Sequence, residues 1–175
     1  MKERAIIPEN TIKLSRKERE LAKTLFIEGL YYDKLKQNAI VVGSHLSFML
    51  HHEGQIISIH FREGLERLKK YKDEPIQMMK KFLGNIQDDL GQLASMLKED
   101  PQLISVKEIW GLCNLSARWG ERHGFITKVW SNNPKKIAVF EQSITGKPQV
   151  ANFEINQPLS LFFHNKDTFR SEFSR

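Results

Sequence analysis

The chain has 175 residues, 40% of them apolar and 27% charged, a composition typical of one folded domain and not of a disordered chain. No apolar run approaches the roughly 20 residues of a membrane-spanning helix, and the single cysteine, Cys113, excludes an internal disulfide. The net charge is +6, and its densest excess, seven basic against three acidic residues over 104–150, favours an anionic partner such as a ligand or an acidic protein surface. We expect a cytoplasmic protein, since the first residues also lack the apolar core of a signal peptide.

A helix is predicted near the N-terminus. Ser15 and Glu18 form the S-x-x-E pattern of a capping box, in which each side chain accepts a hydrogen bond from the backbone N–H of the other residue. The apolar spacing that follows predicts a helix to about Gln37. Residues 1–13 are expected to form a loose terminus.

Alternation of apolar and polar residues from Ala39 to Phe61 predicts two strands. Between them lies the sequence His51-His52-Glu53-Gly54-Gln55, which fits a hairpin turn. Gly54 is expected to supply the positive φ of that turn, because glycine adopts it without steric cost.

Two helices are predicted next, a short one near residues 63–71 and a long one that opens at Pro75. Asp100-Pro101 ends the long helix. Gly84 and Gly91 in it predict the close approach of a neighbour. Its apolar residues step by three and four along one side, either toward the core or toward a second copy of the chain: Ile76, Met79, Leu83, Ile86, Leu90, Leu93 and Leu97.

Residues 104–130 are predicted to form the centre of the fold as a strand, a short helix closed by Gly124, and a second strand. This segment holds Trp110, Trp119 and Trp130. A helix from Asn133 to Gly146, a strand near 153–155 and a strand at 159–163 should follow, with a loose end at about 165–175. The order of elements predicts a single α+β domain over residues 1–175, a small mixed sheet with helices packed on it.

Two pieces of the sequence resemble the YkoP-type family of small bacterial proteins. They are residues 55–61, QIISIHF, and residues 106–112, VKEIWGL, the latter followed by a helix and HGFIT at 123–127. The resemblance spans roughly residues 54–130. It carries over no catalytic residues and implies an accessory role in envelope polysaccharide metabolism.

The stretch from Asn114 and Ala117 through a short helix to Gly124-Phe125 is also similar to part of the GNAT acyltransferases. That resemblance implies a GNAT-like fold, but the helix is one residue shorter and the family's acid-acting tyrosine is missing. A GNAT binds the CoA pyrophosphate with an R/Q-x-x-G-x-G/A loop, whereas residues 61–65 hold one glycine and one acid. We therefore expect no cofactor.

The histidines invite a metal interpretation, because His51, His52, Glu53 and His60 carry ligand-type side chains. Adjacent strand residues point to opposite faces, so His51 and His52 do not share an ion without a bend. A solvated turn is favoured, and no metal site is expected. His60 faces away from its apolar neighbours, which fits a surface position better than a ligand-facing one.

Two further features receive structural interpretations. Asp88 and Asp89 look like paired carboxylates, but adjacent helix positions diverge by about 100°, so both are assigned to a solvated face. Cys113 lacks a recognisable base and is assigned to the core.

The strongest candidate for a binding surface is basic. Arg118 and Arg122 lie four apart on the predicted short helix and therefore on one side of it. Other candidates follow in the chain or are interleaved with them: Trp119, His123, Lys128, Lys135 and Lys136. The alternative is that the charges are merely solvated and the aromatic residues form core.

Three functions follow from these features. The leading one is a non-enzymatic accessory or binding protein for an anionic partner. The second is an acyltransferase, in which Asn114 positions the substrate or cofactor and His60 or His123 is the base. The third is sequence-tolerant nucleic-acid binding, with bases stacked on aromatic side chains. The sequence leaves the oligomeric state open.

Overall fold

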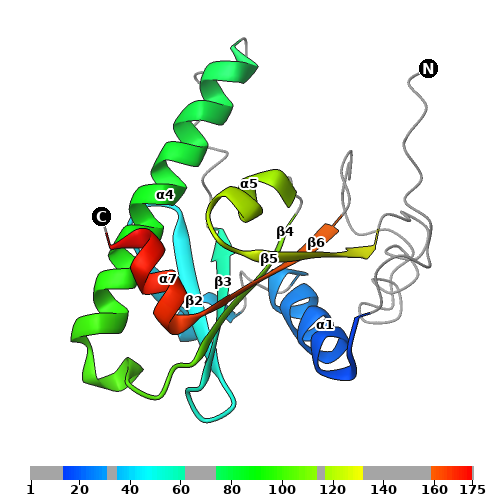
Figure 1. Ribbon diagram of the computed structural model, residues 1–175, viewed down its shortest axis with the longest axis vertical. Helices are drawn as coiled ribbons and strands as arrows, with labels where there is room; N and C mark the ends of the chain where they lie inside the picture. Colours follow the sequence, from blue (N-terminus) through cyan, green and yellow to red (C-terminus); the bar gives the residue numbers. More distant parts are fainter. Residues whose placement is uncertain (1–13, 31–34, 62–73, 114–116, 132–158, 175) are drawn as a thin grey trace. The chain divides into compact units, whose positions relative to one another are not determined.

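The computed structural model describes residues 14–30, 35–61, 74–113, 117–131 and 159–174 (Figure 1). In these ranges, six strands form a mixed sheet in the order β1-β2-β3-β4-β6-β5, accompanied by four α-helices. The predicted α+β class is confirmed. Chain contacts define two compact units, one of residues 1–31 with 112–162 and one of residues 32–111 with 163–175.

The 32–111/163–175 unit is built on a hairpin. Strands β1 (Ile40–Val42), β2 (Leu46–His51) and β3 (Ile56–Phe61) pair antiparallel, and β3 pairs parallel with β4 (Glu108–Cys113). The predicted turn is confirmed, with φ of 81° at Gly54. His52 and Glu53 also have positive φ, of 51° and 59°, so three consecutive residues make the reversal.

Helix α4 (Pro75–Glu99) packs on β1 and β2. The predicted apolar stripe is confirmed in its C-terminal part, where four side chains are buried: Ile86, Leu90, Leu93 and Leu97. It is wrong at Ile76, which is 71% exposed. Close approach is confirmed at Gly91, where a Cβ would lie 3.4 Å from the Phe173 carbonyl oxygen. At Gly84 a Cβ would meet no heavy atom of the described residues within 4 Å.

Helix α4 ends at Glu99, before the predicted Asp100-Pro101, and a 3₁₀ turn, η3 (Pro101–Leu103), follows it. The loose C-terminus is wrong for residues 166–173, which form helix α7 (Lys166–Phe173) beside α4 (Figure 1). Asn165 caps this helix by accepting a hydrogen bond from the Thr168 N–H at 2.9 Å. Phe169 and Phe173 lie one turn apart and are both buried, so the short helix has an apolar side to pack.

The other unit contains α1 (Arg16–Leu30), α5 (Ala117–Arg122), β5 (Ile126–Ser131) and the first part of β6 (Leu159–Asn165). The capping box is confirmed: Ser15 Oγ accepts from the Glu18 N–H at 3.1 Å, and Glu18 Oε2 accepts from the Ser15 N–H at 2.9 Å. Helix α1 is described as far as Leu30, and the next described residue, Leu35, is again helical. A 3₁₀ turn, η1 (Lys36–Asn38), stands where the predicted helix was to end.

The predicted strand–helix–strand of residues 104–130 is confirmed as β4, α5 and β5. Gly124, with φ of 77°, follows α5 as expected, and the predicted last strand is β6. The predictions for residues 1–13, 63–71, 133–146 and 153–155 lie outside the described residues. Among the helices that are described, none has the length and apolarity needed to cross a membrane.

Candidate functional site

Helix α5 is seated directly on its neighbouring strands. Gly120 is buried, and a Cβ there would lie 2.5 Å from Phe162 Cε1 and 2.8 Å from Thr127 Oγ1. On the same helix the Trp119 ring lies 4.9 Å from the His123 ring and 6.1 Å from the Phe125 ring, measured between centroids. These contacts fix the orientation of a helix that is only six residues long.

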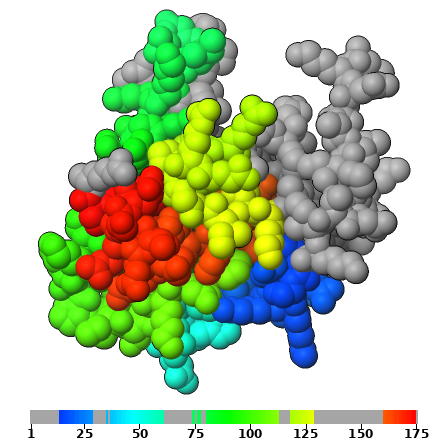
Figure 2. All heavy atoms as spheres, in the orientation of Figure 1, coloured from blue at the N-terminus to red at the C-terminus, as the bar shows by residue number. Residues whose placement is uncertain are grey.

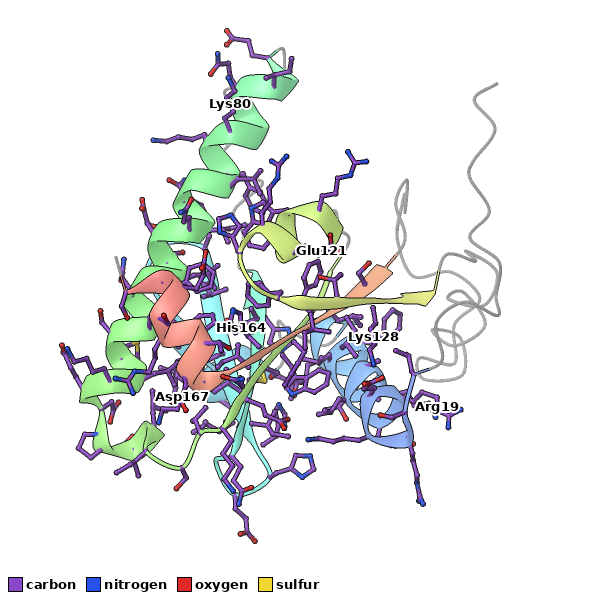
Figure 3. All side chains as sticks on the ribbon, in the orientation of Figure 1. Arg19, Lys80, Glu121, Lys128, His164 and Asp167 are labelled. Carbon is purple, nitrogen blue, oxygen red and sulfur yellow. The ribbon has the colours of Figure 1, made fainter. Side chains whose placement is uncertain are left out.

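Arg118 and Arg122 project from this anchored helix into solvent. Both side chains are exposed, and within the described residues neither forms a hydrogen bond or an ion pair. Glu121, labelled in Figure 3, is also exposed and leaves both guanidinium groups unneutralised. Figure 2 shows α5 and β5, in yellow, at the surface of the face that it presents. Helix α5 therefore presents the two arginines together at the surface, as their spacing in the sequence predicts.

Lys128 does not share that surface. Alternate residues of a strand point to opposite faces, and Thr127 faces Gly120 of α5, so Lys128 faces the other way. Its Nζ lies 2.6 Å from Glu18 Oε1 on α1, and Figure 3 shows Lys128 beside that helix. Strand parity thus places Lys128 on the face of β5 opposite α5, where its charge is paired with Glu18.

The Lys128 contact changes the acidity of Glu18. Partial burial by itself raises the pKa of Glu18, but hydrogen bonds from Lys128 and from the Ser15 N–H, together with the charge of Lys128, outweigh burial. The pKa of Glu18 therefore lies below its usual value. One carboxylate closes the capping box with Oε2 and binds Lys128 with Oε1.

Neither of the two tryptophans whose side chains are described is displayed for stacking. Trp110 is buried, donates a hydrogen bond to Glu108 Oε2 at 2.9 Å and packs against Phe163 with ring centroids 4.6 Å apart. Trp119 is half-buried against His123 and Phe125. Asn114, Lys135, Lys136 and the side chains of Cys113 and Trp130 lie outside the description.

The second candidate cluster surrounds His60 in the other unit. The buried Ser58 hydroxyl lies 2.8 Å from His51 Nε2 and 3.3 Å from His60 Nε2. The β2–β3 register explains this meeting: Met49 is opposite Ser58, and His51 is two residues farther along the same face. Sequence reasoning considered both histidines but missed the serine, although the i, i+2 spacing of Ser58 and His60 places them on one face.

This cluster provides a hydrogen-bonded bridge across the hairpin. A hydroxyl has one proton, so when both rings are neutral it donates to one imidazole and accepts from the other. Within the described parts of the chain, no three His, Cys, Asp or Glu side chains are close enough to share a metal ion. The two histidines considered as acyltransferase bases, His60 and His123, belong to different units.

Asp89 is buried, and its assignment to a solvated face is wrong. Its Oδ1 accepts from the Ser44 N–H at 3.2 Å and its Oδ2 from the His45 N–H at 2.7 Å. Asp88 is exposed, as predicted. The carboxylate of Asp89 therefore ties the turn between β1 and β2 to helix α4.

Comparison with known proteins found no match: no protein-family model fits this chain, and no curated protein or solved structure is significantly similar to it.

Proposed function

We propose that this chain is a non-enzymatic binding protein that holds an anionic partner at helix α5 through Arg118 and Arg122. The observation that carries the proposal is that both arginines are exposed and, within the described residues, unpaired, on a helix fixed by Gly120 and Trp119. A fixed helix limits the entropy lost when the two side chains engage a ligand.

The chemistry of the two groups indicates the class of ligand. A guanidinium presents a planar fork of donors that matches phosphate, sulfate and carboxylate groups, and it stays charged at any physiological pH. Residues four apart on a helix have Cβ atoms about 5–6 Å apart. Two such forks suit a partner that carries anionic groups at short, repeated intervals.

The partner we favour is an anionic polymer. Exposed ion pairs contribute only about 0.2–1 kcal/mol each, so two arginines bind a single small anion weakly. A polymer presents many equivalent positions and gains from the net charge of +6. The resemblance to the YkoP-type family would make an envelope polysaccharide that carries acidic groups a suitable polymer.

Nucleic acid is the less favoured anionic polymer. Single-stranded nucleic acid is bound by aromatic side chains that stack on bases as well as by positive charge. Trp119 already packs against His123 and Phe125, and Trp110 is buried in the other unit. The described surface thus supplies charge without a stacking platform.

The proposal is tested by retention on immobilised heparin at low salt, with Arg118→Glu and Arg122→Glu combined in one variant. The matched control combines Arg16→Glu and Arg19→Glu on α1, where both arginines are also exposed. Each double change replaces two positive charges by two negative ones and lowers the net charge from +6 to +2. We expect the α5 variant to lose retention and the α1 variant to keep most of it.

Two results would count against this function. Equal loss in both variants would show that net charge alone causes retention, and full retention of the α5 variant would exclude the arginine pair. Thermal unfolding of each variant verifies that folding is intact. A single-stranded oligonucleotide that bound tighter than heparin, with loss on the same α5 variant, would move the proposal to nucleic acid.

A further inference from the structure

Strand β1 forms one end of the sheet. In the strand order β1-β2-β3-β4-β6-β5, β2 is the only described strand that pairs with β1. An edge strand presents a row of backbone N–H and C=O groups to any chain that can align with it. Natural proteins usually protect such an edge with lysine, proline or a bulge.

Exposed apolar side chains gather at this edge. Of the seven large apolar side chains that are exposed in the described residues, three lie on β1 and β2: Ile40 at 37%, Val41 at 52% and Leu50 at 39%. Ile40 is opposite Phe48, so Leu50, two residues farther along, lies on the same face as Ile40. Val41 points to the other face. The edge is therefore apolar on both faces of the sheet.

The same segment carries no charge. Residues 37–50, QNAIVVGSHLSFML, contain no Asp, Glu, Lys or Arg, although 27% of the whole chain is charged. None of the usual protective residues is present on β1 itself, whose sequence is IVV. Among the described residues, the protection that β1 has is its short length of three residues.

We propose that β1 is a self-association edge, which pairs antiparallel with β1 of a second copy of this chain. Two copies that each carry a charge of +6 repel, and they approach most easily where neither has a charged side chain. An acidic partner would find no complementary charge at this edge. In a twofold-symmetric antiparallel pair centred on Val41, Val41 lies opposite Val41 of the second copy and Ile40 lies opposite Val42. The same three residues therefore form both sides of the contact.

The pairing is weak because it is short. Three residues of strand and three apolar side chains give a contact at the small end of protein interfaces, so dimer formation depends on protein concentration. Lysine at Val41 sets two like charges opposite each other in the pair, which is unfavourable. At a position that is 52% exposed, the same change leaves the fold of one copy intact.

Sedimentation velocity over a wide concentration range tests the proposal on three proteins: the unaltered chain, Val41→Lys and Ile104→Lys. Ile104→Lys is the control. It adds the same charge at an exposed apolar residue of the same unit, since Ile104 is 77% exposed, but this residue lies outside the sheet. We expect the unaltered chain and Ile104→Lys to dimerise with rising concentration, and Val41→Lys to need at least a tenfold higher concentration.

Disulfide cross-linking of Val41→Cys tests whether Val41 lies opposite Val41 of the second copy. Opposite residues of an antiparallel pair have Cα atoms about 4.5–5.5 Å apart, within the range that a disulfide spans. Mild oxidation should therefore give a disulfide-linked dimer of Val41→Cys. Its yield should exceed the yields from the unaltered chain, which has its native cysteine, and from Ile104→Cys. A chain that stays monomeric throughout, or a dimer that Val41→Lys does not weaken, overturns the proposal. Neither result bears on the arginines of α5.

Discussion

Replacement of Asp89 by alanine should destabilise the protein far more than replacement of its neighbour Asp88. The Asp89 carboxylate is buried and accepts two backbone hydrogen bonds, from Ser44 at 3.2 Å and from His45 at 2.7 Å. Only glycine fits at position 43 of this turn, because its φ is 59° and a Cβ there would lie 1.9 Å from Asp89 Oδ1. The turn and the helix thus meet at one carboxylate.

The expected loss follows from the two bonds. A hydrogen bond to a charged group contributes about 1.5–3 kcal/mol, and the alanine variant loses two of them. The Ser44 N–H is half-buried and regains water, whereas the His45 N–H stays buried without an acceptor. Removal of a buried charge offsets part of the loss. We expect a net decrease of about 3 kcal/mol in the free energy of unfolding, or about 6–12 °C in Tm for a chain of this size.

Urea unfolding followed by far-UV circular dichroism measures the difference. Asp88→Ala is the matched control, because Asp88 is exposed one residue earlier on the same helix and should change stability by less than about 0.5 kcal/mol. Asp89→Asn keeps one acceptor oxygen in the same volume and should fall between the two. A loss below about 1 kcal/mol for Asp89→Ala, or one equal to that of Asp88→Ala, would refute the proposed role of the carboxylate.

Two further predictions concern glycines and acid stability. Gly120→Ala should destabilise by about 1–3 kcal/mol, because the new Cβ would lie 2.5 Å from Phe162 Cε1. Gly84→Ala should stabilise α4 by up to about 1 kcal/mol, since no heavy atom of the described residues would lie within 4 Å of the new Cβ and alanine is the better helix former. Thermal unfolding of the two variants measures the difference. The lowered pKa of Glu18 means that its contribution is present at neutral pH and is lost as the pH falls below about 4.5, through the folded-state pKa. Glu18→Gln should be slightly less stable at pH 7 and should lose less stability on acidification, and an equal acid loss in both proteins would show that the Lys128 contact is not responsible.

Local signals in the sequence were sufficient where the structure depends on neighbours in the chain. The capping box of Ser15 and Glu18 is a four-residue pattern, and the positive φ of Gly54 is a property of the turn itself. Both were predicted correctly. The same is true of the proline that opens α4, because its effect lies within the first turn of the helix.

Contacts between distant segments could not be predicted in this way. Asp88 and Asp89 are equivalent in any local pattern, and they differ because Ser44 and His45, some forty residues away, lie against one of them. The stripe on α4 looked uniform from Ile76 to Leu97, yet Ile76 is 71% exposed while the residues from Ile86 to Leu97 on the stripe are buried. Periodicity marks the side of a helix that can be buried, but it does not show how far along the helix a partner element extends.

The position of Lys128 shows how a correct local prediction can leave a residue's face undecided. A strand was predicted after Gly124, and strand geometry alone requires Thr127 and Lys128 to face opposite sides. What the sequence did not reveal was which side α5 covers. The small side chains at Gly120 and Thr127 could have suggested it, because a helix packs closest where neither surface carries bulk. Had that pair been recognised as the contact, Lys128 would have been assigned to the far face, and the predicted basic surface would have been limited to Arg118 and Arg122.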